Sequence, residues 1–367
     1  MKVIISGGGT GGHIFPAIAV AQELKQKVAN VDILFVGALG KMEMEKVPTA
    51  GFRITGLWIS GMQRKLTLRN LLFPIKLIFS LVKSVFIISR FRPDAVIAFG
   101  GYASGPVSQI AAWKGIPVIL QEQNSYPGIT NKILAGKAKR ICVAYEGMDR
   151  FFDKEKIVFT GNPVRKDISE PDKDINSSLR YFGLTQNKKT VLIFGGSLGA
   201  RSLNEAVLRN LDSITGRNLN IQVLWQVGKL YYDEYSRSEI ANNKAVIILP
   251  FIDKMDKAYE IADLVVARAG ALTISELSIS GKPSVLVPSP NVAEDHQTKN
   301  AMNLVDRNAA IMIRDGEVNK KLGVVITELI SDEKKLAELS GNILKLGRPD
   351  AAEKIADLVI MECKKRK

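Results

Sequence analysis

Two glycine-rich segments, one in each half of the chain, have the composition of loops that bind phosphate groups. The first is SGGGTGGH at 6–13, and the second is GGSLGA at 195–200. Each follows a short apolar run and precedes a helical pattern. Glycine lets the backbone approach a ligand closely, and the N–H groups that open the following helix favour an anion. The pair predicts two Rossmann-like domains that face one phosphorylated ligand.

The first glycine segment does not have the other features of a dinucleotide site. Residues 7–12 match G-x-G-x-x-G, but a dinucleotide site also carries Asp or Glu at the end of the second strand, where it binds the ribose. That strand is expected at 31–36, and it is followed by Gly37 and Ala38. The sequence therefore argues against NAD as a cofactor.

Polar residues follow two further apolar runs of the first half. GGYASGP at 100–106 is either another anion-binding loop or a tight turn required by packing. QEQN at 121–124 follows the next strand. Because ligands of open α/β sheets bind at the carboxyl ends of the strands, both segments are candidates for the site.

The second half has a corresponding set of segments. RAGALTISE at 268–276 leaves a strand and opens a helix. Its first N–H groups suit a diphosphate, and the Glu276 carboxylate suits a ribose diol because it accepts two hydrogen bonds. Alternatively, Thr273 and Glu276 form a capping box, and both interpretations can hold together. EDHQ at 294–297 opens another helix and is placed to reach the sugar of a nucleotide.

The sequence offers little to hold a metal ion. Asp172, Lys173 and Asp174 spell D-x-D, a pattern of metal-dependent glycosyltransferases, but they lie in a polar connector with no strand before them. No cysteine or histidine cluster has metal-ligand spacing. We therefore predict no metal site.

Apolar runs alternate with helical patterns along the chain, and the runs are apolar throughout, as in strands covered on both faces. They are 3–6, 31–36, 95–99, 117–121, 140–144 and 157–160 in the first half, and 190–194, 222–226, 245–249, 264–267, 284–288 and 309–313 in the second. Right-handed βαβ crossovers turn this pattern into two doubly wound parallel sheets. We place the domain boundary at 161–165. An amphipathic helix is expected at 350–362, with one apolar face formed by Ala352, Ile355, Ala356 and Val359.

Composition sets broad limits on function. The 367 residues carry a formal charge of +14, which suits nucleic acid, anionic lipid or a phosphorylated substrate. The chain has no nucleic-acid recognition motif and no interleaving of aromatic and basic residues, so we expect no nucleic-acid partner. Cys142 and Cys363 form no disulfide framework and indicate a reducing compartment. The opening strand leaves no room for a signal peptide.

A helical segment at 66–91 combines many apolar residues with four cations. The cations fall at steps of seven and so form one slowly drifting stripe: Arg69, Lys76, Lys83 and Arg90. Lysines within the span disfavour a transmembrane helix, and Pro74 either interrupts the helix or marks its first turn. Two interpretations remain. The segment is a buried helix with a solvated edge, or it lies on an anionic membrane with its cations at the phosphates.

Eight motifs occur in an order and spacing that resemble those of the MurG family. They are GGTGGHIFP at 8–16, GGYASGP at 100–106, EQN at 122–124, GNPVR at 161–165, GGSLGA at 195–200, FID at 251–253, GALTISE at 270–276 and HQTKNA at 296–301. They cover nearly the whole chain, and their combination is highly specific. The family comprises peripheral membrane N-acetylglucosaminyltransferases that make lipid II in peptidoglycan synthesis.

The resemblance implies the α/β GT-B fold, in which two Rossmann-like domains with doubly wound parallel sheets face a central cleft. It implies an acceptor- and membrane-binding domain at 1–163, a UDP-GlcNAc-binding domain at 164–348, and a last helix at 349–367 that packs back on the first domain. The implied location is the cytoplasmic face of the bacterial cell membrane. There, the segment at 66–91 contacts the anionic surface.

The implied reaction moves N-acetylglucosamine from UDP-GlcNAc to the C4 hydroxyl of MurNAc in undecaprenyl-diphospho-MurNAc-pentapeptide (lipid I). It proceeds with inversion and without a metal or another cofactor. A second reading keeps the fold and changes the acceptor to a diacylglycerol or a soluble sugar. The stripe at 66–91 favours a lipid-borne acceptor over a soluble one.

By the same resemblance, residues of both domains bind the donor. Arg165 and Ser197 contact the diphosphate, Ile252 holds uracil through its backbone, and Gln297 binds sugar hydroxyls. Phosphate and ribose are bound by one run of residues, namely Ala271, Leu272, Thr273, Ile274, Ser275 and Glu276. The opposite wall is lined by Thr10, Gly11, Gly12 and Asn124.

Inversion needs a base for the acceptor hydroxyl and a stabiliser for the charge on departing UDP. Helix N-termini and Arg165 suit the second need. His13 is the first candidate for the base, because an imidazole suits general-base work near neutral pH. It could instead orient its loop or bind the acceptor diphosphate. Glu122 is the rival base, and Tyr102 and Ser104 are expected at the acceptor.

Overall fold

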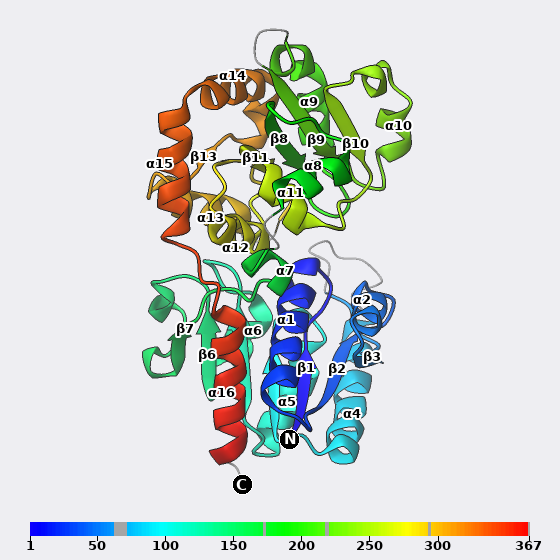
Figure 1. Cartoon of the computed structure of the whole chain (residues 1–367). Coiled ribbons are helices and arrows are strands. Elements are labelled where there is room, and N and C mark those ends of the chain that lie inside the picture. The colour runs from blue at the N-terminus through cyan, green and yellow to red at the C-terminus, as the bar shows by residue number, and fades with distance from the viewer. Residues whose placement is uncertain (62–71, 172–173, 217–219, 293–294, 366–367) are drawn as a thin grey trace. The chain divides into compact units, whose positions relative to one another are not determined.

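The chain forms two compact units, each built on one parallel sheet (Figure 1). The computed structural model describes residues 1–61, 72–171, 174–216, 220–292 and 295–365. One unit comprises Met1–Arg165 and Arg348–Lys367, and the other comprises Lys166–Gly347. Helices cover both sheets, which confirms the expected pair of doubly wound α/β domains.

The first unit has a seven-stranded sheet within its described residues, in the order β3-β2-β1-β4-β5-β6-β7. The strands are β1 (Lys2–Ser6), β2 (Asp32–Ala38), β3 (Arg53–Leu57), β4 (Ala95–Ala98), β5 (Val118–Glu122), β6 (Arg140–Val143) and β7 (Ile157–Phe159). The α-helices are α1 (Gly11–Lys27), α2 (Glu43–Thr49), α4 (Phe73–Phe91), α5 (Ser104–Trp113), α6 (Ile129–Ala135) and α16 (Ala351–Lys365). The strand order reverses between β1 and β4, so the loops after these strands lie at a switch point, where open α/β sheets bind ligands.

The second unit has six strands in its described part, in the order β10-β9-β8-β11-β12-β13. The strands are β8 (Lys189–Phe194), β9 (Ile221–Gln226), β10 (Val246–Leu249), β11 (Leu264–Ala267), β12 (Ser284–Leu286) and β13 (Ile311–Met312). The α-helices are α7 (Lys166–Ser169), α8 (Ile175–Phe182), α9 (Arg201–Ile214), α10 (Tyr232–Ser236), α11 (Met255–Ile261), α12 (Ala271–Ser280), α13 (His296–Val305), α14 (Val318–Ser331) and α15 (Glu333–Leu344). Here the order reverses between β8 and β11, so the same argument applies to the loops after them.

All twelve predicted strands are present within two residues of the predicted bounds. Strand β3 was not predicted. It pairs only with β2 at the edge of the sheet, and its residues alternate less clearly because Arg53 is exposed and Gly56 carries no side chain. It therefore lacks the continuous apolar run by which the other strands were found, including the edge strands β7, β10 and β13.

Helix α16 returns the end of the chain to the first unit. Its buried residues Ile355, Ala356 and Val359 join the core that α1 forms against β1, β2 and β4. This confirms the apolar face predicted for that helix. Lys27 of α1 pairs with Glu353 and Asp357 at 3.1 and 2.7 Å, but such exposed pairs add little stability.

Helix α4 begins with Pro74 in its first turn, as one of the two predictions for that proline had it. Residues 66–71 of the expected helix, Arg69 included, lie outside the described residues. Among the helices that the structure describes, none combines the length and apolarity needed to cross a membrane.

Candidate functional site

The loop between β1 and α1 places the first glycine segment at the switch point of the first sheet. Thr10 is the N-cap residue of α1, and its side chain makes no capping hydrogen bond. Arg165 lies close to this helix end, because its guanidinium is 5.7 Å from the centre of the Phe15 ring. A cation beside uncapped N–H groups is the arrangement that favours a phosphate.

His13 lies in the first turn of α1, half-buried, with one ring nitrogen engaged. Its Nδ1 is 2.8 Å from the carbonyl oxygen of Gly8. A carbonyl only accepts, so Nδ1 carries a proton, and in the neutral ring Nε2 carries the lone pair. Nε2 faces Gly100, where a Cβ would lie 3.1 Å away. Gly100 has φ +90°, so both backbone and space require glycine there.

Glu43 is a buried carboxylate that the sequence reasoning missed. It is the first residue of α2 and has no exposed surface. Its two oxygens accept hydrogen bonds from the N–H groups of Ala38 and Gly9, at 2.9 and 3.0 Å. A Cβ at Gly8 would overlap the carboxylate. Glu43 therefore fixes the glycine loop to the end of β2. No local pattern predicts this contact, because it joins residues 34 positions apart in the chain.

Glu122, the rival base, holds its own loop together. It is 1% exposed, and its carboxylate accepts four hydrogen bonds: from the Asn124 N–H at 3.0 Å, the Asn124 side chain at 3.3 Å, the Gly128 N–H at 3.0 Å and the Asn131 side chain at 2.8 Å. These four donors occupy both oxygens of the carboxylate and tie it to its own loop. Both His13 and Glu122 stay predictions for the base.

The neighbouring amides form a buried network behind the site. Gln121 donates to the Asn162 side chain at 2.9 Å, and Asn162 donates to the carbonyl of Gln123 at 3.1 Å. Gln123 donates to the carbonyl of Phe99 at 2.7 Å. These contacts tie the ends of β4 and β5 to the segment that carries Arg165.

Of the two expected acceptor residues, Ser104 has an internal role. It is fully buried, and its hydroxyl donates to the carbonyl of Gly100 at 2.6 Å. It therefore closes the turn after β4, as the packing interpretation of GGYASGP had it. Tyr102 is half-exposed and lies against Gly61, where a Cβ would overlap its ring. Tyr102 thus remains a surface side chain next to the loop of His13.

In the second unit, the glycine loop after β8 precedes α9, and Ser197 is exposed on it. Gln226 ends β9 and is 4% exposed. Its Oε1 accepts from the Ile252 N–H at 2.7 Å, and its Nε2 donates to the carbonyl of Gly196 at 2.9 Å. Gln226 therefore links the segment expected to hold uracil to the loop expected near the diphosphate.

Helix α12 begins at Ala271 with Gly270 as an N-cap that makes no side-chain hydrogen bond. Thr273 lies inside the helix, so the capping-box interpretation of Thr273 and Glu276 is wrong. Glu276 is nearly buried, and the Tyr259 hydroxyl donates to one of its oxygens at 2.9 Å. The Ser275 hydroxyl donates to the Ala271 carbonyl at 3.0 Å. The helix end suits an anion, and Tyr259 orients the carboxylate predicted to bind ribose.

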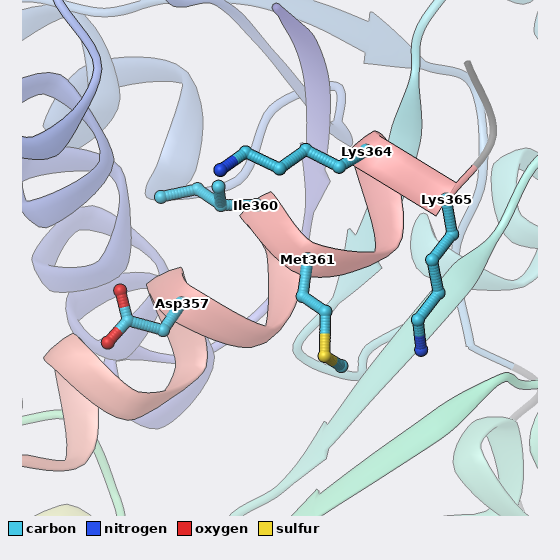
Figure 2. Close-up of a pocket in the computed structure, with 5 residues that line it drawn as sticks. All are labelled: Asp357, Ile360, Met361, Lys364 and Lys365. Carbon is cyan, nitrogen blue, oxygen red and sulfur yellow. The ribbon is translucent and has the colours of Figure 1, made fainter.

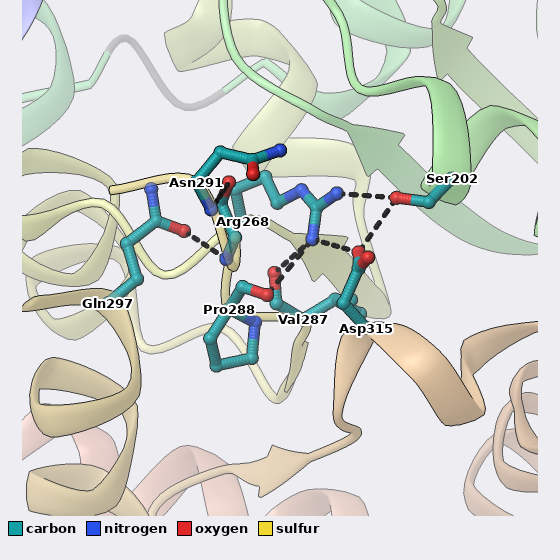
Figure 3. Close-up of polar contacts among 8 residues, drawn as sticks. Ser202, Arg268, Val287, Pro288, Asn291, Gln297 and Asp315 are labelled. Carbon is teal, nitrogen blue, oxygen red and sulfur yellow. Dashed lines mark hydrogen bonds and ion pairs between the residues drawn. The ribbon is translucent and has the colours of Figure 1, made fainter. Parts of the chain in front are cut away.

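Figure 3 shows a polar cluster that joins several loops of the second unit. Arg268 follows β11 and donates to the carbonyls of Val287 and Pro288, both at 3.1 Å. It also pairs with Asp315 at 2.6 Å and donates to Ser202 at 2.7 Å. The sequence reasoning missed this role, although a cation directly after a buried strand was a usable signal.

Gln297 lies beside this cluster in Figure 3. Its Oε1 accepts from the Ser289 N–H at 2.8 Å. This contact fixes which end of the amide is oxygen, so the amide NH2 is the end left for a ligand. Glu294, the other polar residue expected at this helix start, lies outside the described residues.

The predicted D-x-D motif has Asp172 and Lys173 outside the described residues. In the part of the chain that is described, no group of three acidic, histidine or cysteine side chains is placed to hold a metal ion. Figure 2 shows a hollow lined only by α16, by Asp357, Ile360, Met361, Lys364 and Lys365. None of these is an expected site residue.

Helix α4 turns an apolar face outward. We define the α4 apolar face as the exposed residues Leu72, Ile75, Ile78, Phe79, Val82, Val85 and Phe86. Two cations of the expected stripe bind the protein instead: Lys76 donates to the Ser60 hydroxyl at 3.0 Å, and Lys83 donates to the Gly56 carbonyl at 2.7 Å. Because these apolar residues are exposed, the prediction of a buried helix with a solvated edge is wrong. The alternative interpretation placed the cations at membrane phosphates, but Lys76 and Lys83 make their contacts within the protein. Contact of the apolar side with a membrane stays a prediction.

Comparisons with known proteins agree along the whole chain. Residues 3–143 match the glycosyltransferase family 28 N-terminal domain, and residues 190–355 match the family 28 C-terminal domain. A protein of Flavobacterium psychrophilum is 51% identical over 359 residues, which are 98% of this chain and 97% of that protein. A protein of Cytophaga hutchinsonii is 52% identical over 358 residues, 98% of this chain and 96% of that protein. Both are named UDP-N-acetylglucosamine--N-acetylmuramyl-(pentapeptide) pyrophosphoryl-undecaprenol N-acetylglucosamine transferase.

Solved structures show the same architecture. The crystal structure of Acinetobacter baumannii MurG has a TM-score of 0.75 and 29% identity, and the match covers 98% of this chain and 99% of that one. A UDP-GlcNAc 2-epimerase of Neisseria meningitidis, bound to UDP-GlcNAc, has a TM-score of 0.69 at 15% identity, over 98% of this chain and all of that chain. The similarity to the epimerase, at 15% identity, concerns the fold alone.

Proposed function

Because this chain belongs to glycosyltransferase family 28, we propose that it moves N-acetylglucosamine from UDP-GlcNAc to the C4 hydroxyl of MurNAc in lipid I, undecaprenyl-diphospho-MurNAc-pentapeptide. The relatives at about 50% identity are named for this donor and for a pyrophosphoryl-undecaprenol acceptor. The product of this reaction is lipid II, the lipid-linked disaccharide of peptidoglycan synthesis.

One observation about the two units carries the proposal. Helices α1, α9 and α12 follow the central strands of their sheets, and none has a capping side chain. Other described helices, such as α5, α6 and α13, also lack a capping side chain. What sets α1, α9 and α12 apart is that they begin at the switch points of the two sheets, where open α/β sheets bind ligands. The N–H groups at uncapped helix ends suit a diphosphate. This supports a sugar nucleotide as the ligand.

The donor residues predicted from the sequence fit this assignment. Arg165 and Ser197 bind the diphosphate, and the Ile252 backbone holds the uracil through its carbonyl, because its N–H already donates to Gln226. The run from Ala271 to Glu276 binds phosphate and ribose. The free amide end of Gln297 donates to a sugar hydroxyl. Tyr259 supports this assignment because it holds the Glu276 carboxylate in one orientation.

The chemistry is one displacement at the anomeric carbon. The C4 oxygen of MurNAc forms a bond to C1 of N-acetylglucosamine from the face opposite UDP, and the bond from C1 to the β-phosphate oxygen breaks with its electron pair on UDP. The hydroxyl proton passes to Nε2 of His13, whose lone pair the Nδ1 contact supports. Arg165 and helix N–H groups stabilise the charge on the leaving diphosphate. No metal takes part in this scheme.

A transfer assay tests the reaction. UDP release from UDP-GlcNAc is measured with lipid I, with a diacylglycerol, with a soluble sugar, and with no acceptor. We expect release that depends on lipid I. Release that needs only one of the other acceptors contradicts the assignment and favours the second reading.

His13→Ala separates the possible tasks of the histidine. A general base contributes about 10²–10⁴-fold to the rate, so kcat should fall by that factor. A rise in the KM for lipid I with unchanged kcat would instead assign His13 to acceptor binding.

We also propose that the first unit binds an anionic membrane surface through the α4 apolar face. Exposed apolar patches of this kind are typical of interaction sites, and amphipathic helices lie on bilayers with their apolar side inserted. Trp58 extends the patch, because its ring contacts Phe79 with centroids 5.9 Å apart. Flotation with vesicles of anionic and of neutral lipid tests the proposal, and we expect co-flotation with the anionic vesicles. Recovery of all the protein in the unbound fraction contradicts it.

A further inference from the structure

One peptide group of the first glycine loop is held at both of its ends. The carbonyl of the Gly8–Gly9 peptide accepts from Nδ1 of His13 at 2.8 Å. The N–H of the same peptide donates to Oε2 of Glu43 at 3.0 Å. A continuous hydrogen-bonded path therefore runs from the Glu43 carboxylate through the peptide to the imidazole.

We propose that Glu43 is a positioning residue that acts on His13 through this peptide. A carboxylate that accepts from a peptide N–H polarises the peptide and makes its carbonyl a stronger acceptor. The stronger acceptor holds the proton on Nδ1 and leaves the lone pair on Nε2. Second-sphere carboxylates orient metal-bound histidines by the same logic. The inference rests on the proposed function, because the Nε2 lone pair matters there only if His13 is the base.

The surroundings make Glu43 a strong constraint. Its carboxylate is fully buried, and Oε1 accepts from the Ala38 N–H at 2.9 Å. Each oxygen thus accepts from an N–H group. A glutamine has one carbonyl oxygen, so it can accept from only one of these two N–H groups.

Within the described residues, three other segments lie near the ring of His13. Oγ1 of Thr10, the N-cap of α1, is 3.3 Å from Nδ1. Gly100 of the loop after β4 faces Nε2, and Arg165 lies over the ring of Phe15, two residues from His13. The carboxylate that accepts from the Gly8–Gly9 peptide is that of Glu43.

The tautomer of His13 can be measured directly. The chain has only two histidines, His13 and His296, so ¹⁵N NMR of the imidazole nitrogens gives two assignable sets of signals. In the unmodified enzyme without substrate, we expect neutral His13 with its proton on Nδ1. A neutral His13 with its proton on Nε2 overturns the inference, and this measurement needs no variant.

Glu43→Gln then tests the carboxylate. We expect a measurable share of the Nε2–H tautomer at His13 with an unchanged far-UV circular dichroism spectrum and an unchanged unfolding transition, which report an intact fold. The His296 signals in the other unit should also stay unchanged. The matched control is Asp94→Asn. Asp94 also accepts a backbone N–H of β1, from Lys2 at 2.7 Å, but at the amino end of the strand. It should leave the tautomer unchanged. Equal shifts in both variants, or no shift in Glu43→Gln, overturn the inference.

A double-mutant cycle gives the kinetic readout. Outer-sphere partners of a functional histidine typically contribute 10–100-fold, so we expect Glu43→Gln to lower kcat by roughly that factor. In the His13→Ala background the same change should alter kcat by less than about twofold, because the partner is gone. An undiminished loss in that background assigns Glu43 a structural role and overturns the inference. If His13→Ala itself keeps full kcat, the proposed base fails, while the tautomer result still stands on its own.

Discussion

Replacing Gln226 by methionine should weaken donor binding, because this side chain ties together two segments of the second unit that we propose to bind the donor. The Ile252 N–H donates to its Oε1 and its Nε2 donates to the Gly196 carbonyl, at 2.7 and 2.9 Å. The Ile252 N–H can only donate and the Gly196 carbonyl can only accept, so the orientation of the Gln226 amide is fixed. Methionine fills a similar volume and makes neither bond.

The size of the effect follows from burial. Gln226 is 4% exposed and Ile252 is 3% exposed. A buried group left without its partner costs about 1–3 kcal/mol, so losing both bonds should lower the free energy of unfolding by about 2–6 kcal/mol. Ordering the two loops again on binding should cost about 1.4 kcal/mol, which corresponds to a roughly tenfold higher KM for UDP-GlcNAc.

Gln222→Met is the matched control. Gln222 lies on the same strand, is 2% exposed and makes four hydrogen bonds with Thr185 and Thr190, but at the other end of β9. Chemical denaturation and steady-state kinetics on both variants give the comparison. Gln222→Met should lose at least as much stability and keep the KM within about twofold, because its site is remote from the donor. An equal rise of KM in both variants, or none in Gln226→Met, would refute the reasoning.

Three further predictions follow from other parts of the molecule. Phe86→Ser should change the free energy of unfolding by less than about 0.5 kcal/mol, because Phe86 is 69% exposed. The same substitution should lower vesicle binding about tenfold, because it removes an apolar side chain from the inserted α4 apolar face. Unchanged flotation contradicts membrane contact through this face. Glu122→Gln should lower Tm, since several buried donors lose their acceptor at a cost of about 2–4 kcal/mol. The kcat per folded molecule should stay within about threefold. A fall in kcat of about 10²–10⁴-fold would instead identify Glu122 as the base. Burial raises the pKa of Cys142 from 9.0 to about 12, so the unfolded thiol ionises first and stability falls by about 1.4 kcal/mol per pH unit above pH 9. Cys142→Ala should remove this part of the decline in denaturation curves recorded from pH 8 to 11, and identical pH curves for both proteins contradict the assignment.

The parallel strands and glycine loops were predictable because their signals are local. Residues 3–6 and 190–194 are apolar runs followed directly by glycine, and both became central strands with a helix N-terminus after them. Strand β3 gave no such signal, because Arg53, Thr55 and Gly56 interrupt its apolar residues. Its place at an edge is not the cause, since the edge strands β7, β10 and β13 were predicted from their apolar runs.

The tasks of polar residues were less predictable, because they depend on partners distant in sequence. Glu122 and Ser104 stand where a site residue is expected, yet the fold surrounds Glu122 with N–H donors and turns the Ser104 hydroxyl to the Gly100 carbonyl. Glu43 shows the reverse case. It follows no strand directly and matches no motif, and its function arises from the approach of α2 to the glycine loop.

The return of α16 to the first unit has a consequence for synthesis on the ribosome. The second unit is one continuous stretch, Lys166–Gly347, and can close as soon as it has emerged. The first unit lacks part of its interior until the last residues appear, because Ile355, Ala356 and Val359 cover α1. Until then, the apolar side of α1 stays open to water for the time that some 200 further residues take, at about 5–20 residues per second. During synthesis, the second unit therefore completes its fold before the first unit does.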